Sequence, residues 1–371
     1  MKHKLLIIGI LLCAALLCTS CVYRLKPIKG AEDKPEEPPK IMDPNPMFPV
    51  KKDGKWGYMD KAGTIVITPQ FDEAHTFSDG LAMVEVGSGE AGRYGFIDKS
   101  GRFVINPDFR LALPFSEGLA GVKTSSGEKS QWGFIDKTGR ITISMRFDWV
   151  GPFSEGLAEV QIGANVGYID KKGEMVIKLK FAMSGAAGRF SEGLAAAKTG
   201  KEFGYIDKHG RYVINPQFAD AEPFSEGLAA VRSGDLKTGK WGYIDKTGKY
   251  AITPQFDSAD SFSEGLAAVE ISNMKTGNWG YIDSTGNIII SPKYDAAAPF
   301  SEGLALIIVG DLKSGGLGFI DKTGKIVIEP QLHQMFYSFS EGLAQVRIGD
   351  FETGKWGYID KTGKYVWEPT N

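Results

Sequence analysis

Cysteine is almost absent from this 371-residue chain, and its three copies are confined to positions 13, 18 and 21. With none after residue 21, the rest of the chain can form neither a disulfide framework nor a thiolate metal site. Histidine is also scarce, at positions 3, 75, 209 and 333, and no HxxH or HExxH spacing occurs. The sequence therefore predicts no metal site.

An excess of one charge is also lacking, since 43 Lys and Arg face 45 Asp and Glu, for a formal net charge of −2. Basic residues alternate with acidic ones and form no stripe, so nucleic-acid binding is not predicted. No G-x-S-x-G elbow, Walker loop or calcium loop is present. We expect a protein that is not an enzyme and binds no cofactor.

Long hydrophobic runs are missing except for "LLIIGILLCAALL" at 5–17, which follows Lys2 and Lys4. A membrane span needs about 20 residues, so this run is typical of a secretory signal peptide instead. It leads to "CTSC" at 18–21, which resembles the lipobox of bacterial lipoproteins, although Cys18 stands where Leu is usual. The alternative is an ordinary signal peptide that happens to contain cysteines.

The lipobox resemblance implies a signal peptide at 1–20 and acyl chains, such as palmitate, on Cys21. More than one acyl chain gives stable membrane anchoring. We therefore expect an exported protein that is lipid-anchored to the outer or the cytoplasmic membrane of a bacterial cell envelope. Residues 22–50 hold seven of the 18 prolines and the charged run "AEDKPEEPPK". Such a stretch cannot bury enough apolar surface to fold, so 21–50 is predicted to be a disordered tether.

One unit is repeated through the remaining chain, 51–371. The glycine of the phrase "KWGYIDKTGK" recurs at 57, 95, 133, 167, 204, 242, 280, 318 and 357, at intervals of 34 to 39 residues. "PQF" and "FSEGLA" recur at the same period. "KWGYID", "KYVI" and "GLAAV" each predict a short strand, the first two joined by a hairpin, and Pro is expected to end the second. Units of about 38 residues with three strands predict an all-β repeat protein.

Two acidic positions recur too often to be catalytic. The Asp after "WGYI" is present in every copy, at 60, 98, 136, 170, 207, 245, 283, 321 and 360. A catalytic acid occurs once or twice in one pocket, so we expect these Asp side chains to cap turns. The Glu of "FSEG", together with its Ser, is expected to bond to local backbone groups at a bend.

The bulky residue of the "WG" pair has two readings, a packing residue or a platform for a ligand. Val166 and Leu317 replace the ring in two copies. Since any bulky apolar group suits a core, whereas a platform requires a flat ring, we favour packing. The structural aromatics are then Trp56, Tyr94, Trp132, Phe203, Trp241, Trp279 and Trp356. The invariant Gly that follows predicts a close approach of another backbone or ring.

These phrases together resemble the WG-repeat family of bacterial proteins over about 51–369. The resemblance implies a repeat fold and no particular activity. Neighbouring units must cover each other's apolar faces, which a β-propeller-like ring or an open β-solenoid of stacked hairpins could do. We favour the ring, and we expect a monomer.

The loops between "GLAxV" and "WG" differ most among the units, as "VQIGANV" and "VRSGDLKTGKW" show. Variation on a constant frame is typical of a binding face, and also of unconstrained loops. The sequence favours an envelope lipoprotein with a non-catalytic scaffold that binds an unidentified protein. The alternative is a surface that binds carbohydrate or peptidoglycan through exposed aromatic rings.

Overall fold

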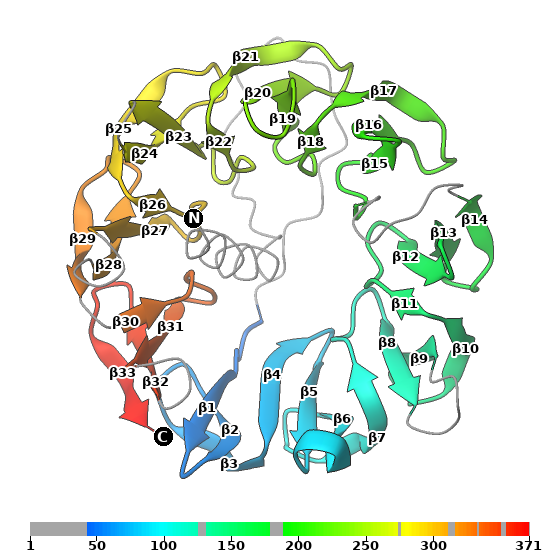
Figure 1. Ribbon diagram of the computed structural model, residues 1–371. Helices are drawn as coiled ribbons and strands as arrows, with labels where there is room; N and C mark the ends of the chain where they lie inside the picture. The colour runs from blue at the N-terminus through cyan, green and yellow to red at the C-terminus, as the bar shows by residue number, and fades with distance from the viewer. Residues whose placement is uncertain are drawn as a thin grey trace. The chain divides into compact units, whose positions relative to one another are not determined.

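Short antiparallel strands form nearly all of the computed structural model, which describes residues 43–124, 131–178, 188–273, 276–310, 316–331, 334–349 and 354–370 (Figure 1). The one helix in these ranges is a 3-10 turn, η1 (Gly89–Ala91). No helix within them is long and apolar enough to cross a membrane. Two compact units are present, a larger one of Pro46–Asp257 with Thr370, and a smaller one built on Ser258–Pro369.

The larger unit holds five sheets, in the orders β1-β2-β3, β10-β9-β8-β7-β6-β5-β4, β11-β12-β13-β14, β15-β16-β17 and β18-β19-β20-β21. Strands adjacent in the chain are adjacent in each sheet, so every sheet is a meander. The strands are β1 (Phe48–Lys52), β2 (Lys55–Met59), β3 (Ile65–Phe71), β4 (Glu73–Ser78), β5 (Leu81–Val86), β6 (Arg93–Ile97), β7 (Phe103–Ala112), β8 (Leu119–Thr124), β9 (Trp132–Asp136), β10 (Ile141–Phe147), β11 (Trp149–Val150), β12 (Leu157–Ile162), β13 (Asn165–Asp170), β14 (Met175–Lys178), β15 (Ala195–Thr199), β16 (Glu202–Ile206), β17 (Tyr212–Phe218), β18 (Asp220–Ala221), β19 (Leu228–Ser233), β20 (Lys240–Asp245) and β21 (Tyr250–Phe256).

The smaller unit holds three four-stranded meanders, β22-β23-β24-β25, β26-β27-β28-β29 and β30-β31-β32-β33. Its strands are β22 (Ser258–Ala259), β23 (Ala267–Asn273), β24 (Thr276–Ile282), β25 (Ile288–Tyr294), β26 (Ala296–Ala297), β27 (Leu304–Val309), β28 (Gly316–Asp321), β29 (Ile326–Gln331), β30 (Gln334–Phe336), β31 (Leu343–Ile348), β32 (Lys355–Asp360) and β33 (Tyr365–Thr370).

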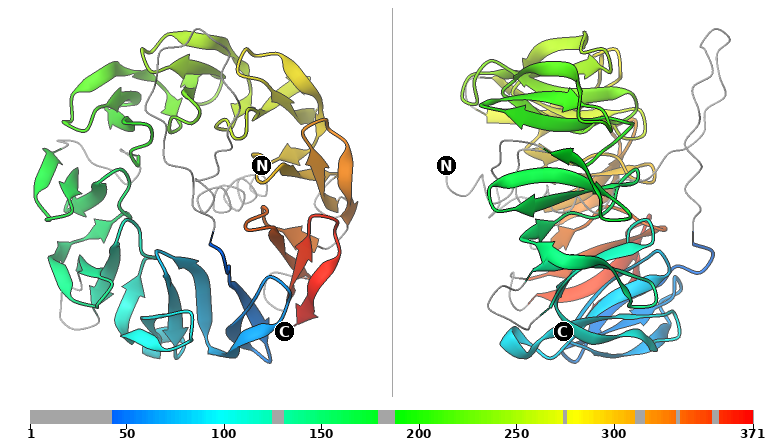
Figure 2. Two further views of the ribbon diagram at one scale, coloured as in Figure 1. Left: turned by 180° about the vertical axis from the view of Figure 1, so that it is seen from behind. Right: turned by 90° about the vertical axis from the view of Figure 1, so that its right-hand side faces the viewer.

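A short first strand makes most sheets four-stranded, one more than the three strands predicted for each unit. In the sheet β18-β19-β20-β21, this strand is Asp220–Ala221, which pairs with Arg232 and Val231 of β19. Two residues are too few to produce a periodic pattern, so the sequence pattern did not reveal it. The right-hand view of Figure 2 shows the sheets of the larger unit from the side, with their strands running across the view. The hairpin turns between the third and fourth strands therefore lie at one end of each sheet. The loops between the second and third strands lie at the other end.

In six of the eight sheets the last strand continues through its proline, which corrects the prediction that Pro ends it; β10 and β14 contain none. β21 includes Pro254 and pairs with β20 as Trp241↔Phe256 and Tyr243↔Ile252, so four residues of β21 match two of β20. This bulge lies on an edge strand, where a missing N–H costs little. It also explains the invariant glycine, because a Cβ on Gly242 would lie 2.6 Å from the Ile252 carbonyl oxygen. The predicted close approach is confirmed.

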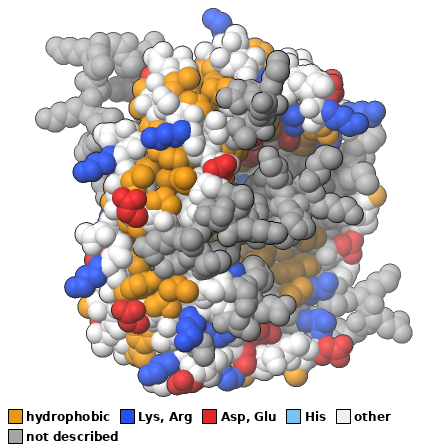
Figure 3. Space-filling model, turned by 60° about the vertical axis from the view of Figure 1, so that its left-hand side comes forward, with side chains coloured by type: hydrophobic (Ala, Val, Ile, Leu, Met, Phe, Trp, Pro, Cys, Tyr) orange, Lys and Arg blue, Asp and Glu red, His pale blue; other side chains and the backbone are white. Residues whose placement is uncertain are grey.

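The outer strands of the smaller unit expose apolar side chains, and Figure 3 shows such side chains, in orange, interrupted by charged ones. Ile288 and Ile289 of β25 and Ile326 and Val327 of β29 are among the exposed hydrophobic residues. These strands are sheet edges. The bulge at the proline interrupts the regular hydrogen-bonding pattern of these edge strands. Such an interruption hinders pairing of an exposed edge with another chain.

Most of the core lies between successive sheets. One cluster joins Phe134 of β9 and Phe147 of β10 to Val150 of β11 and Val160 of β12, all with 2% or less of their surface exposed. Two further clusters combine neighbouring sheets in the same way, whereas the cluster around Phe96 lies between repeats that share the seven-stranded sheet. The sequence predicted that adjacent repeats cover each other's apolar faces. This prediction is confirmed for the repeats inside the larger compact unit and for those inside the smaller one.

Candidate functional site: the junctions between sheets

The recurring Asp closes the hairpin between the third and fourth strands. The Oδ1 atom of Asp245 accepts hydrogen bonds from the Thr247 amide at 2.9 Å, the Thr247 hydroxyl at 2.6 Å and the Lys249 amide at 3.1 Å. These bonds, that of the Thr247 hydroxyl foremost, lower the pKa of Asp245. The same pair of amide bonds is present in the other eight copies. The predicted role as turn cap is confirmed.

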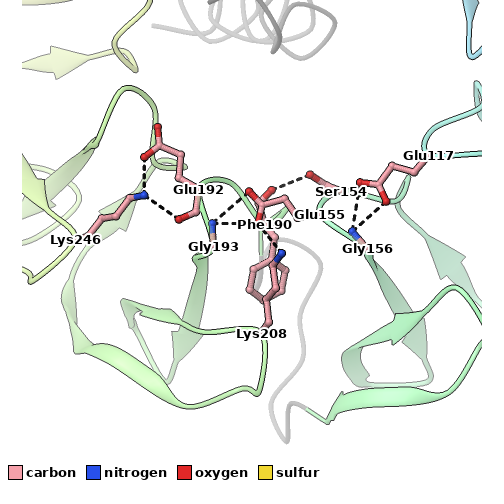
Figure 4. A network of polar contacts seen from close by, with 9 residues as sticks. All are labelled: Glu117, Ser154, Glu155, Gly156, Phe190, Glu192, Gly193, Lys208 and Lys246. Carbon is pink, nitrogen blue, oxygen red and sulfur yellow. Dashed lines mark hydrogen bonds and ion pairs between the residues drawn. The ribbon is translucent and has the colours of Figure 1, made fainter. Parts of the chain in front are cut away.

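The Glu of "FSEG" does not bond locally as predicted, because its side chain reaches the next sheet. Glu155 has a left-handed backbone, with φ of 52°, which turns the carboxylate forward. Its two oxygens accept from the amide of Gly193 at 3.0 and 3.2 Å, and Lys208 Nζ lies 3.1 Å from Oε2 (Figure 4). Figure 4 shows a similar arrangement at the preceding junction, where Glu117 meets Gly156, and at the following one, where Glu192 meets Lys246. Glu192 also accepts from the amide of Gly227 at 3.1 Å.

The Ser before this Glu also bonds across the junction. The hydroxyl of Ser154 donates to the carbonyl of Phe190, 2.8 Å away in the next copy of the phrase. The expectation of local bonding is wrong for both residues, since each satisfies a backbone group of the following repeat. Bonds from amides to a carboxylate are charge-assisted and therefore among the stronger hydrogen bonds. The partly exposed Lys–Glu pairs each contribute about 1 kcal/mol or less.

The aromatic residue two positions after the "W" forms the apolar part of each junction. Tyr205 of β16 is fully buried, and its ring meets that of Phe224 edge to face, with 4.8 Å between centroids. Its hydroxyl donates to the carbonyl of Glu222 at 2.7 Å, and burial raises its pKa well above 10. Equivalent edge-to-face or tilted pairs occur at six other junctions.

Sequence reasoning missed this aromatic position, although a signal was available. Unlike the "W" position, it holds Tyr or Phe in all nine copies, at 58, 96, 134, 168, 205, 243, 281, 319 and 358. A ring that no copy replaces by Val or Leu indicates a geometric requirement, here an edge-to-face contact. The invariance of the ring therefore indicated the junction more strongly than the tryptophan did.

The predicted structural aromatics lie at the margin of this core. Trp132 and Trp241 are buried, with 8% and 7% of their surface exposed. The other five are partly buried: Trp56, Tyr94, Phe203, Trp279 and Trp356. Some have polar or stacking partners, as Tyr94 donates to Glu73 at 2.8 Å and the Trp356 ring stacks on Tyr337 at 6.0 Å. Their packing role stays a prediction, and Cys21 lies outside the described residues.

Chemically, these groups form a frame that joins neighbouring sheets. Within the described ranges, no group of three or more His, Cys, Asp or Glu is placed to hold a metal ion. The recurring acids, amides and hydroxyls bond to turns or to the next sheet. What the arrangement can do is hold neighbouring sheets in a fixed register and present the loops that differ between repeats.

Comparison with known proteins supports the repeat reading. The model of a family described as "WG containing repeat" matches residues 56–88, 94–126, 132–165, 167–202, 203–236, 241–274, 279–312 and 318–350. No curated protein matches the chain. A solved structure of a eukaryotic initiation factor is 12% identical, with a TM-score of 0.62, over 89% of this chain and 96% of that one. The β-propeller domain of the Trilobed protease from Pyrococcus furiosus covers 88% of this chain and 99% of its own at 8% identity, with a TM-score of 0.41.

These likenesses concern the fold alone. Together with the meander sheets, the likeness to the initiation factor confirms the prediction of an all-β repeat protein with a propeller-like fold.

Proposed function

The chain belongs to the WG containing repeat family, and on that premise we propose that it is a non-catalytic binding scaffold anchored to the cell envelope by a lipid on Cys21. The observation that supports a scaffold is the use of the shared polar residues. Asp caps its own hairpin, whereas Ser, Glu and Lys join one sheet to the next. Side chains that make these bonds build a rigid frame. We therefore assign binding to the loops that differ between repeats.

The loop at residues 234–239 is a suitable binding segment because it is both exposed and held in shape. Asp235 Oδ1 accepts from the amides of Lys237 and Thr238 at 2.7 and 2.9 Å, and Arg232 Nε donates to the Gly239 carbonyl at 3.1 Å. Leu236 at its tip is 59% exposed. A preorganised loop loses little conformational entropy on binding, so an exposed Leu beside a Lys can contact a protein partner efficiently.

A pull-down from envelope extracts tests this proposal. The bait is the chain from residue 46 onward, compared with a variant carrying Leu236→Ser and Lys237→Ser. The matched control is Lys249→Ser, in the hairpin turn at the other end of β20. We expect the loop variant to lose most of the captured protein while the control retains it. Capture of the same proteins by all three forms would show that the loop is not the binding segment.

The lipid anchor has a separate test. Cys21→Ser should move the full-length protein from the membrane fraction to the soluble fraction, because the acylated residue is gone. Cys13→Ser, within the apolar run, is the matched control and should stay with the membrane. If Cys21→Ser partitions with the membrane as the unaltered protein does, acylation at this residue is wrong.

A further inference from the structure

One tryptophan differs from the other six in its exposure. Trp149 in β11 has 45% of its surface exposed, whereas the remaining tryptophans are buried or partly buried. It belongs to no "WG" pair and occurs in the short first strand, at a position filled by Asp220 and Ser258 in the strands β18 and β22. An exposed indole is not required by the junctions, so this ring is free to contact a ligand.

A glycine provides the space in which this indole lies. A Cβ on Gly151 would lie 3.3 Å from Cη2 and 3.7 Å from Cζ3 of Trp149, so a side chain there would displace the ring. The same Cβ would lie 3.7 Å from the Cβ of Glu159, which places the far edge of the indole beside that residue. The Gly151 amide donates to the Glu159 carbonyl oxygen at 2.8 Å, fixing the two strands together.

Two polar side chains lie beside the ring, Gln161 and Glu159, and a third, Arg189, is near Glu159. Gln161 is directly opposite Trp149 in the register of β11 and β12. Glu159 stands where the corresponding positions of other repeats hold Met83, Gly121 or Ala230. Its burial raises its pKa to about 7, against the opposing effect of the Arg189 charge. A carboxyl group near half-protonation can both donate and accept hydrogen bonds, as a sugar hydroxyl does.

Arg189 completes the group from the next repeat. Burial lowers its pKa, an effect that the charge of Glu159 opposes. In the described part of the chain, no hydrogen bond or ion pair joins the carboxyl of Glu159 to this guanidinium. Arg189 is exposed overall and Glu159 is half-buried, so both can form hydrogen bonds with a ligand.

We propose that Trp149, Glu159, Gln161 and Arg189 form a carbohydrate-binding subsite at the junction of the sheets β11-β14 and β15-β17. The indole stacks on the C–H face of a pyranose ring, and the carboxyl group, the guanidinium group and the side-chain oxygen of Gln161 bind its hydroxyls, since Gln161 Nε2 already donates to the Gly163 carbonyl at 2.9 Å. An aromatic wall with a few convergent polar groups is the usual composition of a small-ligand site. This subsite goes beyond the proposed protein-binding loop.

The charges at the site favour a sugar over other ligands with a flat or apolar face. A quaternary ammonium ion would also stack on an indole, but Arg189 offsets the attraction that the Glu159 carboxylate exerts on a cation, so the site has no net negative charge to hold one. A nucleic acid would require a basic surface, whereas the chain has a net charge of −2 and no basic stripe. A neutral polyhydroxylated ring suits the mixture of one acid, one amide and one guanidinium.

The test uses the chain from residue 46 onward on an array of immobilised oligosaccharides that includes peptidoglycan fragments. The best-bound oligosaccharide is then titrated by calorimetry against the unaltered protein, Trp149→Ala, Trp149→Phe and Glu159→Gln. We expect Trp149→Ala to weaken binding at least tenfold and Glu159→Gln severalfold, with Trp149→Phe between the unaltered protein and Trp149→Ala. Because Trp149 is exposed, the melting temperature of the Trp149→Ala variant should differ little from that of the unaltered protein. Saturating oligosaccharide should shift the tryptophan fluorescence of the unaltered protein but not that of Trp149→Phe.

Two results would overturn the subsite: no oligosaccharide on the array binds, or the bound one has the same affinity for Trp149→Ala and Glu159→Gln as for the unaltered protein. The double variant Leu236→Ser, Lys237→Ser serves as the matched control and should retain sugar binding. Conversely, Trp149→Ala should retain protein capture through the loop at 234–239. Failure of one proposal is therefore distinguishable from failure of the other.

Discussion

Gly242 in β20 and Gly227 in the turn before β19 both belong to recurring phrases, yet the structure gives them different reasons to be glycine. A Cβ on Gly242 would lie 2.6 Å from the Ile252 carbonyl oxygen and 2.7 Å from the Pro254 nitrogen, both backbone atoms of the paired strand. Gly227 has no atom within 4 Å of such a Cβ, but its φ is +85°. Replacement is therefore prevented by contact at one site and by backbone conformation at the other.

The two alanine variants should differ in cost. Gly227→Ala forces a side chain into the left-handed region, which costs about 1–2 kcal/mol. Gly242→Ala must push two backbone segments apart against the β20–β21 ladder, and we expect a loss of about 3–5 kcal/mol or failure to fold. In a unit of this size, each kcal/mol lowers the melting temperature by about 2–4 °C.

Asparagine provides the decisive comparison, because it tolerates the left-handed region better than alanine but is larger. Gly227→Asn should be more stable than Gly227→Ala, whereas Gly242→Asn should be no better than Gly242→Ala. Thermal melting followed by far-UV circular dichroism measures all four, with exposed Thr253→Ala as the control. Equal losses at the two sites, or Asn worse than Ala at position 227, would refute the assignment.

Three further variants test the junctions. Tyr205→Phe keeps the ring contact but leaves the Glu222 carbonyl without its 2.7 Å partner, so urea unfolding should show a loss of about 1–2 kcal/mol. Trp241→Ala should cost about 3–5 kcal/mol if the indole is core, and an unchanged melting temperature would favour a ligand platform instead. Because the pKa of Glu159 rises from 4.5 to about 7 on folding, the free energy of unfolding should fall as pH rises between those values. Glu159→Gln should remove the part of that slope that comes from this carboxyl, about 3 kcal/mol for about 2.5 pH units, while Glu222, whose pKa burial also raises, keeps its own contribution. Identical pH profiles of the two proteins would contradict this expectation.

Features set by neighbours in the chain could be predicted from the sequence. Asp245 bonds to residues two and four positions away, so the phrase "DKTGK" contains both the acceptor and its donors. The glycine after the tryptophan was also predictable, because its invariance beside a bulky residue indicated a close approach. In both cases the cause lies in the hairpin itself.

Features set by the neighbouring sheet could not be predicted in this way. The partner of Glu155 is Gly193, 38 residues ahead, and the left-handed backbone that directs the carboxylate there is unusual for Glu. The proline was misjudged because a bulge lets an edge strand continue through it. Trp149 and Glu159 were overlooked because they depart from the repeat, and comparison between repeats emphasises what they share.

The forward reach of the glutamate gives the array a direction. At the junctions from Asp79 to Gly227 and from Glu264 to Gly342, the turn at "FSEG" supplies an acceptor for the amide of the following copy. The hydroxyl of its Ser donates to a Phe carbonyl there, as Ser154 does to Phe190. If one whole repeat were duplicated in the chain, the new copy could therefore form the same hydrogen bonds to the repeat before it and to the repeat after it. No new kind of contact would be needed. The chain could lengthen or shorten by whole sheets during evolution, and departures such as Trp149 could then arise in one copy while the others keep the frame intact.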